Sequence, residues 1–118
     1  MARRLVLRCA LIVVCMWLTR GEAARAASAD KGRDVYANRC AFCHGAGGKG
    51  DGPAAAALKP PPTNFAAVDF WKRVNPETIK GVIQNGKPGT AMVAFKASLN
   101  DEQIDDLIAY LRTFSPQP

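Results

Sequence analysis

The feature that most constrains this chain is the run Cys40-Ala41-Phe42-Cys43-His44. A Cys-x-x-Cys-His run is typical of a site where haem is attached covalently to a polypeptide. Two thiols separated by two residues can each form a thioether with one vinyl group of a single haem. The imidazole that follows the second cysteine can then bind the iron from the proximal side. The pattern therefore predicts thioether bonds at Cys40 and Cys43 and an iron ligand at His44.

Three other uses of this cluster remain open. A structural zinc site usually has four Cys or His ligands, whereas His44 is the only histidine of the chain. A thioredoxin-like pair of redox cysteines normally follows a strand in a βαβ unit, and the sequence indicates neither. A plain disulfide between the two cysteines would leave His44 without a role. Haem attachment is the interpretation that accounts for all three side chains.

The start of the chain has the composition of an export signal. Three arginines precede an uncharged, mostly aliphatic run over residues 9–18, which is too short for a membrane span of about 20 residues. Ala27-Ser28-Ala29 fits the small-residue pattern of a cleavage site, and Ala24-Arg25-Ala26 is a second candidate. We expect a signal peptide over residues 1–29, cleaved after Ala29, and a periplasmic domain over residues 30–118.

The charge of the expected mature chain is small. The leader carries five arginines and one glutamate, so that +4 of the formal charge of +6 belongs to it and +2 remains. We therefore expect no nucleic-acid partner, and no membrane span in the mature form. The remaining 89 of 118 residues suit one domain, whose apolar core is thin at this size. A buried haem would supplement such a core.

Apolar spacing and end signals predict a helical domain. We expect helices over residues 31–40, from Pro76 until Gly86, and over residues 101–113, with a short helix or turn over residues 65–74. The last helix is the clearest, because its apolar residues recur at helical spacing: Ile104, Leu107, Ile108 and Leu111.

Single residues on these helices carry further predictions. A glycine inside a helix costs about 1 kcal/mol relative to alanine, so Gly32 indicates close approach of another helix. Tyr110 is expected to share a packing face with Gly32 and Tyr36. The carboxylates of Asp105 and Asp106 are expected on the solvent side of the last helix.

The stretch after His44 predicts a loop that turns tightly around the haem edge. Five glycines lie between Gly45 and Gly52, but no strand precedes them and no Gly-Lys-Ser/Thr follows, which argues against a phosphate cradle. The run of prolines at residues 60–62 has no backbone N–H groups. We expect the carbonyl of Pro60 or Pro61 to accept the ring N–H of His44 and fix its tautomer.

A second iron ligand is expected at Met92, the only methionine outside the leader. It lies in the Gly- and Pro-rich stretch of residues 86–95. A thioether sulfur is a suitable axial ligand, and His/Met ligation raises the reduction potential of haem iron. The alternative is that Met92 only packs against the haem and leaves the sixth position open. Trp71 is a candidate donor to a haem propionate, although an ordinary packing role suits it equally.

Together these features resemble the class I c-type cytochromes of the small soluble bacterial kind. The resemblance covers residues 30–114 and rests on five marks: Gly32-x-x-x-Tyr36 before the cysteines, Gly-Lys-Gly-Asp-Gly-Pro, Pro-Pro-Pro-Thr-Asn-Phe, Gly-Thr-Ala-Met92, and Asp-Leu-Ile-Ala-Tyr-Leu111. It implies an all-α fold of three to five short helices around one covalent haem, with the first and last helices crossing. It also implies His44 and Met92 as axial ligands. Many relatives carry proline after the ligand methionine, where this chain has Val93.

These expectations predict a periplasmic one-electron carrier and no enzyme activity. Its partners would be redox proteins in transient complexes, which five lysines could help to dock: Lys49, Lys59, Lys72, Lys87 and Lys96. One alternative is a dedicated cytochrome subunit of a periplasmic dehydrogenase or oxidase. Another is a haem ligand-binding or peroxidase-like protein, which would require displacement of Met92. The electron donor and acceptor do not follow from the sequence.

Overall fold

The computed structural model describes residues 25–116, so most of the expected export signal lies outside the described residues. The described part is helical and contains no strand, which confirms the all-α prediction. Its elements are α2 (Ala29–Arg39), α3 (Ala41–His44), the 3-10 helix η1 (Ala55–Ala57), α4 (Val68–Arg73), α5 (Pro76–Asn85), α6 (Asp101–Leu111) and the 3-10 helix η2 (Arg112–Phe114). None of these helices combines the length and apolar character that crossing a membrane requires.

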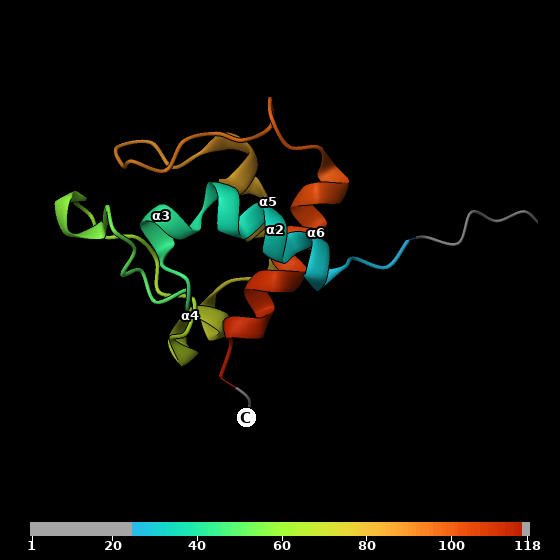
Figure 1. The fold of residues 1–118 in the computed structure, drawn as a ribbon, viewed down its shortest axis with the longest axis horizontal. Coiled ribbons are helices and arrows are strands. Elements are labelled where there is room, and N and C mark those ends of the chain that lie inside the picture. Colours follow the sequence, from blue (N-terminus) through green and yellow to red (C-terminus); the bar gives the residue numbers. More distant parts are fainter. Residues whose placement is uncertain (1–24, 117–118) are drawn as a thin grey trace, which may run out of the picture.

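The first and last helices cross at the centre of the molecule (Figure 1). A Cβ atom built on Gly32 of α2 would lie 2.0 Å from the carbonyl oxygen of Asp106 on α6. Only glycine therefore permits this approach, which confirms the role expected for Gly32. Tyr36 of α2 and both Ile104 and Leu107 of α6 are almost completely buried. Burial of each such aliphatic side chain stabilises the fold by about 1.5–3 kcal/mol.

An aromatic cluster extends the crossing toward the Cys-x-x-Cys-His run. The ring of Tyr36 lies 5.3 Å from that of Tyr110 and 5.2 Å from that of Phe114. The hydroxyl of Tyr36 donates a hydrogen bond of 2.6 Å to the carbonyl of Gly45, the residue after His44. Burial raises the pKa of Tyr36 far above its usual range, so this hydroxyl stays protonated and remains a donor. The shared packing face of Tyr36 and Tyr110 is confirmed.

The expectation that Asp106 faces solvent is wrong. Its side chain is buried, with 3% of the residue exposed. One carboxylate oxygen accepts the backbone N–H of Ser28 at 2.6 Å and the other accepts the Arg25 guanidinium at 3.2 Å. Helical periodicity could not predict this burial, because the segment that covers Asp106 enters from before α2. Asp105 is exposed as expected and pairs with the Lys80 ammonium at 2.7 Å.

Local end signals explain where most helices begin and end. The side chain of Asn75 caps α5 by accepting the N–H of Thr78 at 2.8 Å, and Gly86 ends α5 with a φ of 72°. Asn100 and Gln103 form the predicted capping box of α6. The first helix begins two residues earlier than expected, because Ser28 caps it.

Candidate haem site

The Cys-x-x-Cys-His run forms a helical turn of its own. Cys40 follows α2 and precedes α3, and its carbonyl accepts the N–H of His44 at 2.8 Å. Cys40, Cys43 and His44 are all half-buried, and both cysteines are free thiols. Burial, followed by the charge of Cys43, raises the pKa of the Cys40 thiol to about 11. Such a thiol has little thiolate at neutral pH, which disfavours a reactive redox pair.

The glycine-rich loop packs on this turn through backbone contacts. Gly52, Ala54 and Gly50 donate their N–H groups to the carbonyls of Cys43, Phe42 and His44, at 3.1, 3.0 and 2.8 Å. A Cβ atom on Gly52 would lie within 2.5 Å of a carbonyl oxygen of the turn. Because its amides bind carbonyls, the loop has a structural role here and does not act as a phosphate cradle.

The imidazole of His44 is oriented by two neighbours. Its Nδ1 lies 3.1 Å from the carbonyl oxygen of Thr63. The ring of Phe65 stacks against it, with 4.7 Å between ring centres and 24° between planes. Burial lowers the pKa of His44, and the Thr63 carbonyl opposes this shift only in part. The imidazole is therefore neutral at pH 7, with Nδ1–H as the donor and Nε2 as the nitrogen available to a metal.

The partner expected for His44 has to be corrected. Pro60 and Pro61 are exposed, and the accepting carbonyl belongs to Thr63. A proline run removes backbone donors but does not determine which carbonyl of the following segment reaches the imidazole. The contribution of Thr63 comes from its backbone, so its side-chain identity gave no signal. The stacking of Phe65 was also missed, because the sequence indicated only a short helix or turn over residues 65–74.

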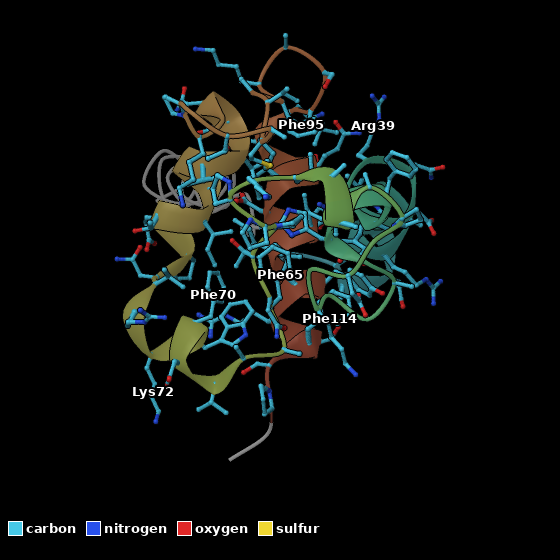
Figure 2. All side chains as sticks on the ribbon, turned by 90° about the vertical axis from the view of Figure 1, so that its left-hand side faces the viewer. Arg39, Phe65, Phe70, Lys72, Phe95 and Phe114 are labelled. Carbon is cyan, nitrogen blue, oxygen red and sulfur yellow. The ribbon has the colours of Figure 1, made fainter. Side chains whose placement is uncertain are left out.

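Of the two roles left open for Trp71, the structure supports packing within the domain over donation to a haem propionate. Its indole N–H donates to the carbonyl of Phe65 at 2.7 Å, so the structure gives this donor a backbone acceptor. The guanidinium of Arg112 lies 5.3 Å from the centre of the Trp71 ring, within range of a cation–π contact. Figure 2 shows Phe65 and Phe70 turned toward the centre of the molecule, whereas Arg39 and Lys72 point outward. Trp71 therefore stabilises the segment whose Phe65 ring contacts His44.

Met92 lies on a loop that is closed by a backbone hydrogen bond within it and is bonded to α5 at its far end. Lys87 donates its N–H to the Met92 carbonyl at 3.0 Å, and Phe95 donates to the carbonyl of Ile83 at 2.9 Å. The N–H of Met92 is bound by the hydroxyl oxygen of Thr90 at 3.1 Å. The half-buried Met92 side chain packs against the hydrophobic core, while the neighbouring Val93 is 62% exposed. The loop thus has an ordered backbone that limits where the sulfur can lie.

The chemistry of these groups fits a covalently attached haem. Two free thiols share one helical turn, which suits two thioether bonds. The neutral imidazole of His44 keeps Nε2 available because Nδ1 is bound to a carbonyl. The thioether of Met92 is a soft ligand suited to haem iron. The described residues could therefore supply both covalent attachment and two axial ligands.

Comparison with known proteins identifies similar chains. A family model described as cytochrome c matches residues 29–115. Cytochrome c6 from Thermostichus vulcanus is 31% identical over 111 residues, which are 94% of this chain and 91% of that protein. Dihydro-heme d1 dehydrogenase from Pseudomonas aeruginosa is 34% identical over 108 residues, which are 91% of this chain but only 20% of the dehydrogenase. The solved KustC0563 c-type cytochrome has 28% identity and a TM-score of 0.61, over 72% of this chain and 98% of that one.

Proposed function

Because this chain belongs to the cytochrome c family, whose members carry covalently bound haem c, we propose that it is a periplasmic one-electron carrier. Haem iron supplies the redox chemistry, since it alternates between ferric and ferrous states. Cys40 and Cys43 hold the haem through thioethers, and His44 and Met92 bind its iron. The observation that carries this proposal is the orientation of the His44 ring, whose Nδ1 is bound to Thr63 and whose face is covered by Phe65.

Rigid ligands suit electron transfer, because little rearrangement is then needed when the charge changes. His44 is held by a carbonyl and a stacked ring, and Met92 lies on a loop with backbone bonds to α5. The neighbours of His44 are an apolar ring and a backbone carbonyl, so the proposal assigns no catalytic acid or base.

Exposed lysines would guide the carrier to acidic faces of its partners. All five lysines expected to dock a partner have exposed side chains: Lys49, Lys59, Lys72, Lys87 and Lys96. Redox encounters of this kind are small and weak, and salt screens them. The partners are therefore redox proteins bound transiently.

A second candidate function is that of a cytochrome subunit within a dehydrogenase or oxidase complex. The similarity to one fifth of the Pseudomonas aeruginosa dehydrogenase favours it, since a related segment there belongs to a larger enzyme. Lasting co-purification with an enzyme subunit from the native host would support this function over that of a free carrier.

The experiment that tests the carrier function uses absorption spectra of purified holoprotein in both oxidation states. We expect a charge-transfer band between the methionine sulfur and ferric iron, which Met92→Ala abolishes and the control Val93→Ala retains. We also expect carbon monoxide to bind the reduced Met92→Ala protein but not the native one. A native protein that lacks the band and binds carbon monoxide would contradict the proposal and support a ligand-binding protein. Mass analysis should show one haem added, and none in a Cys40→Ser/Cys43→Ser double variant.

A further inference from the structure

The segment before α2 is part of the folded domain. Ser28 makes three hydrogen bonds. Its N–H donates to Asp106 Oδ1 at 2.6 Å. Its hydroxyl oxygen accepts the N–H of Lys31 at 3.4 Å, and its carbonyl oxygen accepts the N–H of Gly32 at 3.0 Å. Ser28 lies between the two candidate cleavage positions. Cleavage after Ala29 would remove Ser28, whereas cleavage after Ala26 would retain it.

Because of Asp106, the two cleavage positions differ strongly in their effect on the stability of the folded domain. The buried carboxylate of Asp106 is bound by Ser28 and Arg25, and both would be lost by cleavage after Ala29. Loss of the segment would remove both hydrogen bonds of this carboxylate, and hydrogen bonds to a charged group are stronger than those between neutral groups. The new ammonium group of Asp30 would also lie in the first turn of α2, where the helix dipole disfavours positive charge.

Cleavage after Ala26 keeps the hydrogen bond from Ser28 to Asp106. It removes Arg25, which pairs with Asp106 and Glu102. It also creates an ammonium group on Ala27, one residue before Ser28. Residues 25–27 are exposed and outside any helix, whereas Ala29 is half-buried in the first residue of α2. Cleavage after Ala26 therefore leaves α2 and its cap Ser28 intact.

We propose that the export signal is removed after Ala26, so that the mature protein begins at Ala27. Ala24-Arg25-Ala26 provides the small residues that such cleavage requires. This inference rests on the export assumed in the proposed function, but it does not depend on the axial ligands or the redox role.

The first test determines the N-terminal residue of holoprotein isolated from an export-competent bacterial host. We expect Ala27 by mass analysis of the N-terminal peptide, and a start at Asp30 would overturn the proposal. A bulky residue at the cleavage position should block processing, so Ala26→Leu should accumulate precursor. The control Ala29→Leu should keep the start at Ala27. Normal processing of Ala26→Leu would also overturn the proposal, whatever the haem spectra show.

The second test isolates the physical argument. Two forms are exported behind an unrelated leader with a fixed cleavage site, one beginning at Ala27 and one at Asp30. We expect the Ala27 form to melt several degrees higher, and Asp106→Asn to remove most of that difference. Equal melting temperatures of the two forms would overturn the argument from Ser28, and unchanged haem spectra would show that the proposed function is unaffected.

Discussion

The imidazole of His44 has one neighbour that fixes its proton and one that fixes its plane. Thr63 holds Nδ1–H, and Phe65 stacks on the ring. Stacked aromatic pairs contribute about 0.5–1.5 kcal/mol beyond the area they bury. A residue that limits rotation of an iron ligand influences the electronic structure of the haem without touching the iron.

Replacement of Phe65 should therefore change the spectroscopic signature of the oxidised holoprotein. We expect Phe65→Leu to redistribute the paramagnetically shifted haem methyl resonances in the proton NMR spectrum, because the His44 ring loses its stacking partner. Phe70→Leu is the matched control, since Phe70 contacts Phe65 and Trp71 and has no ring contact with His44. Identical shifts in the Phe65→Leu and native spectra would contradict the role assigned to Phe65.

Tyr36 provides a second test at the scale of one atom. Tyr36→Phe removes the hydroxyl that binds the Gly45 carbonyl, which then accepts only the N–H of Gly48. We expect a loss of about 0.5–1.5 kcal/mol in the free energy of unfolding, measured by denaturant titration. Tyr110→Phe changes the same atom on a neighbouring ring of the cluster and should have little effect. Equal losses in both variants would show that the bond to Gly45 contributes nothing.

At this scale, side-chain chemistry could be predicted from the sequence and backbone partners could not. Cys40, Cys43, His44 and Met92 could be proposed from the sequence because their sulfur and nitrogen atoms are themselves the signal. The carbonyl of Thr63 is chemically the same as any other, so only the path of the chain reveals it.

The packing of α2 on α6 depends on the absence of one methyl group. Gly32→Ala would place a carbon atom 2.0 Å from a backbone oxygen that has no flexible side chain to move. Overpacking of this kind costs about 1–3 kcal/mol or more, and we expect a correspondingly lower free energy of unfolding. The measurement is denaturant unfolding of the holoprotein.

The control for Gly32 is a second glycine inside a helix. A Cβ atom on Gly81 of α5 would meet nothing within 4 Å. Gly81→Ala should therefore stabilise the protein by about 0.5–1 kcal/mol, because alanine favours the helix. If the free energy of unfolding changed in the same direction in Gly32→Ala and Gly81→Ala, the steric explanation would be contradicted.

The buried carboxylate at the same crossing predicts a pH dependence. The N–H of Ser28 is the main cause that holds the pKa of Asp106 below its usual value of 3.8, and Arg25 adds to it in the uncleaved chain. A mature protein that begins at Ala27 keeps the main cause. The unfolded chain therefore binds this proton more readily than the native state. The stabilisation is fully present above pH 3.8 and is lost as the pH falls through the native pKa.

This pH dependence can be measured with Asp106→Asn. We expect the free energy of unfolding of the variant to be lower than that of the native protein at pH 5. This difference should become smaller as the pH falls toward 3. The matched control is Asp105→Asn, which changes the exposed neighbouring carboxylate and should give a smaller difference at pH 5. A difference in the free energy of unfolding between Asp106→Asn and the native protein that stays constant with pH would contradict the pKa shift.

The helices themselves could largely be predicted from the sequence. Asn75, Gly86 and the capping box of Asn100 are local signals that act within one turn, and each was confirmed. Gly32 indicated a close crossing, since its position within a helix is otherwise unfavourable. The burial of Asp106 was missed because it depends on Ser28, a residue expected to leave with the signal.

The whole molecule distributes its charges unevenly along the chain. The exposed acidic residues Asp101 and Asp105 of α6 engage Gln84 and Lys80 of α5. The loop of Met92, in contrast, carries the exposed Lys87. An approaching anion therefore meets positive charge near the proposed sulfur ligand, although the expected mature chain is only weakly basic.

This distribution predicts a salt-dependent reaction with a small anionic oxidant. We expect Lys87→Glu to slow oxidation of the reduced holoprotein by ferricyanide severalfold at low ionic strength. The difference should vanish near 1 M salt, where the Debye length is about 3 Å. Arg33→Glu makes the same change of charge on α2 and should have a smaller effect. Equal slowing by both variants would show that only net charge matters.

The crossing of α2 and α6 also has a consequence for the order of events during synthesis. Gly32 and Asp106 lie far apart in the sequence, so α2, which leads to the two cysteines, lacks its packing partner until α6 has also been made. Until then the two thiols belong to a chain that has not closed around them. An attachment enzyme that meets the chain before α2 and α6 have packed can reach both thiols.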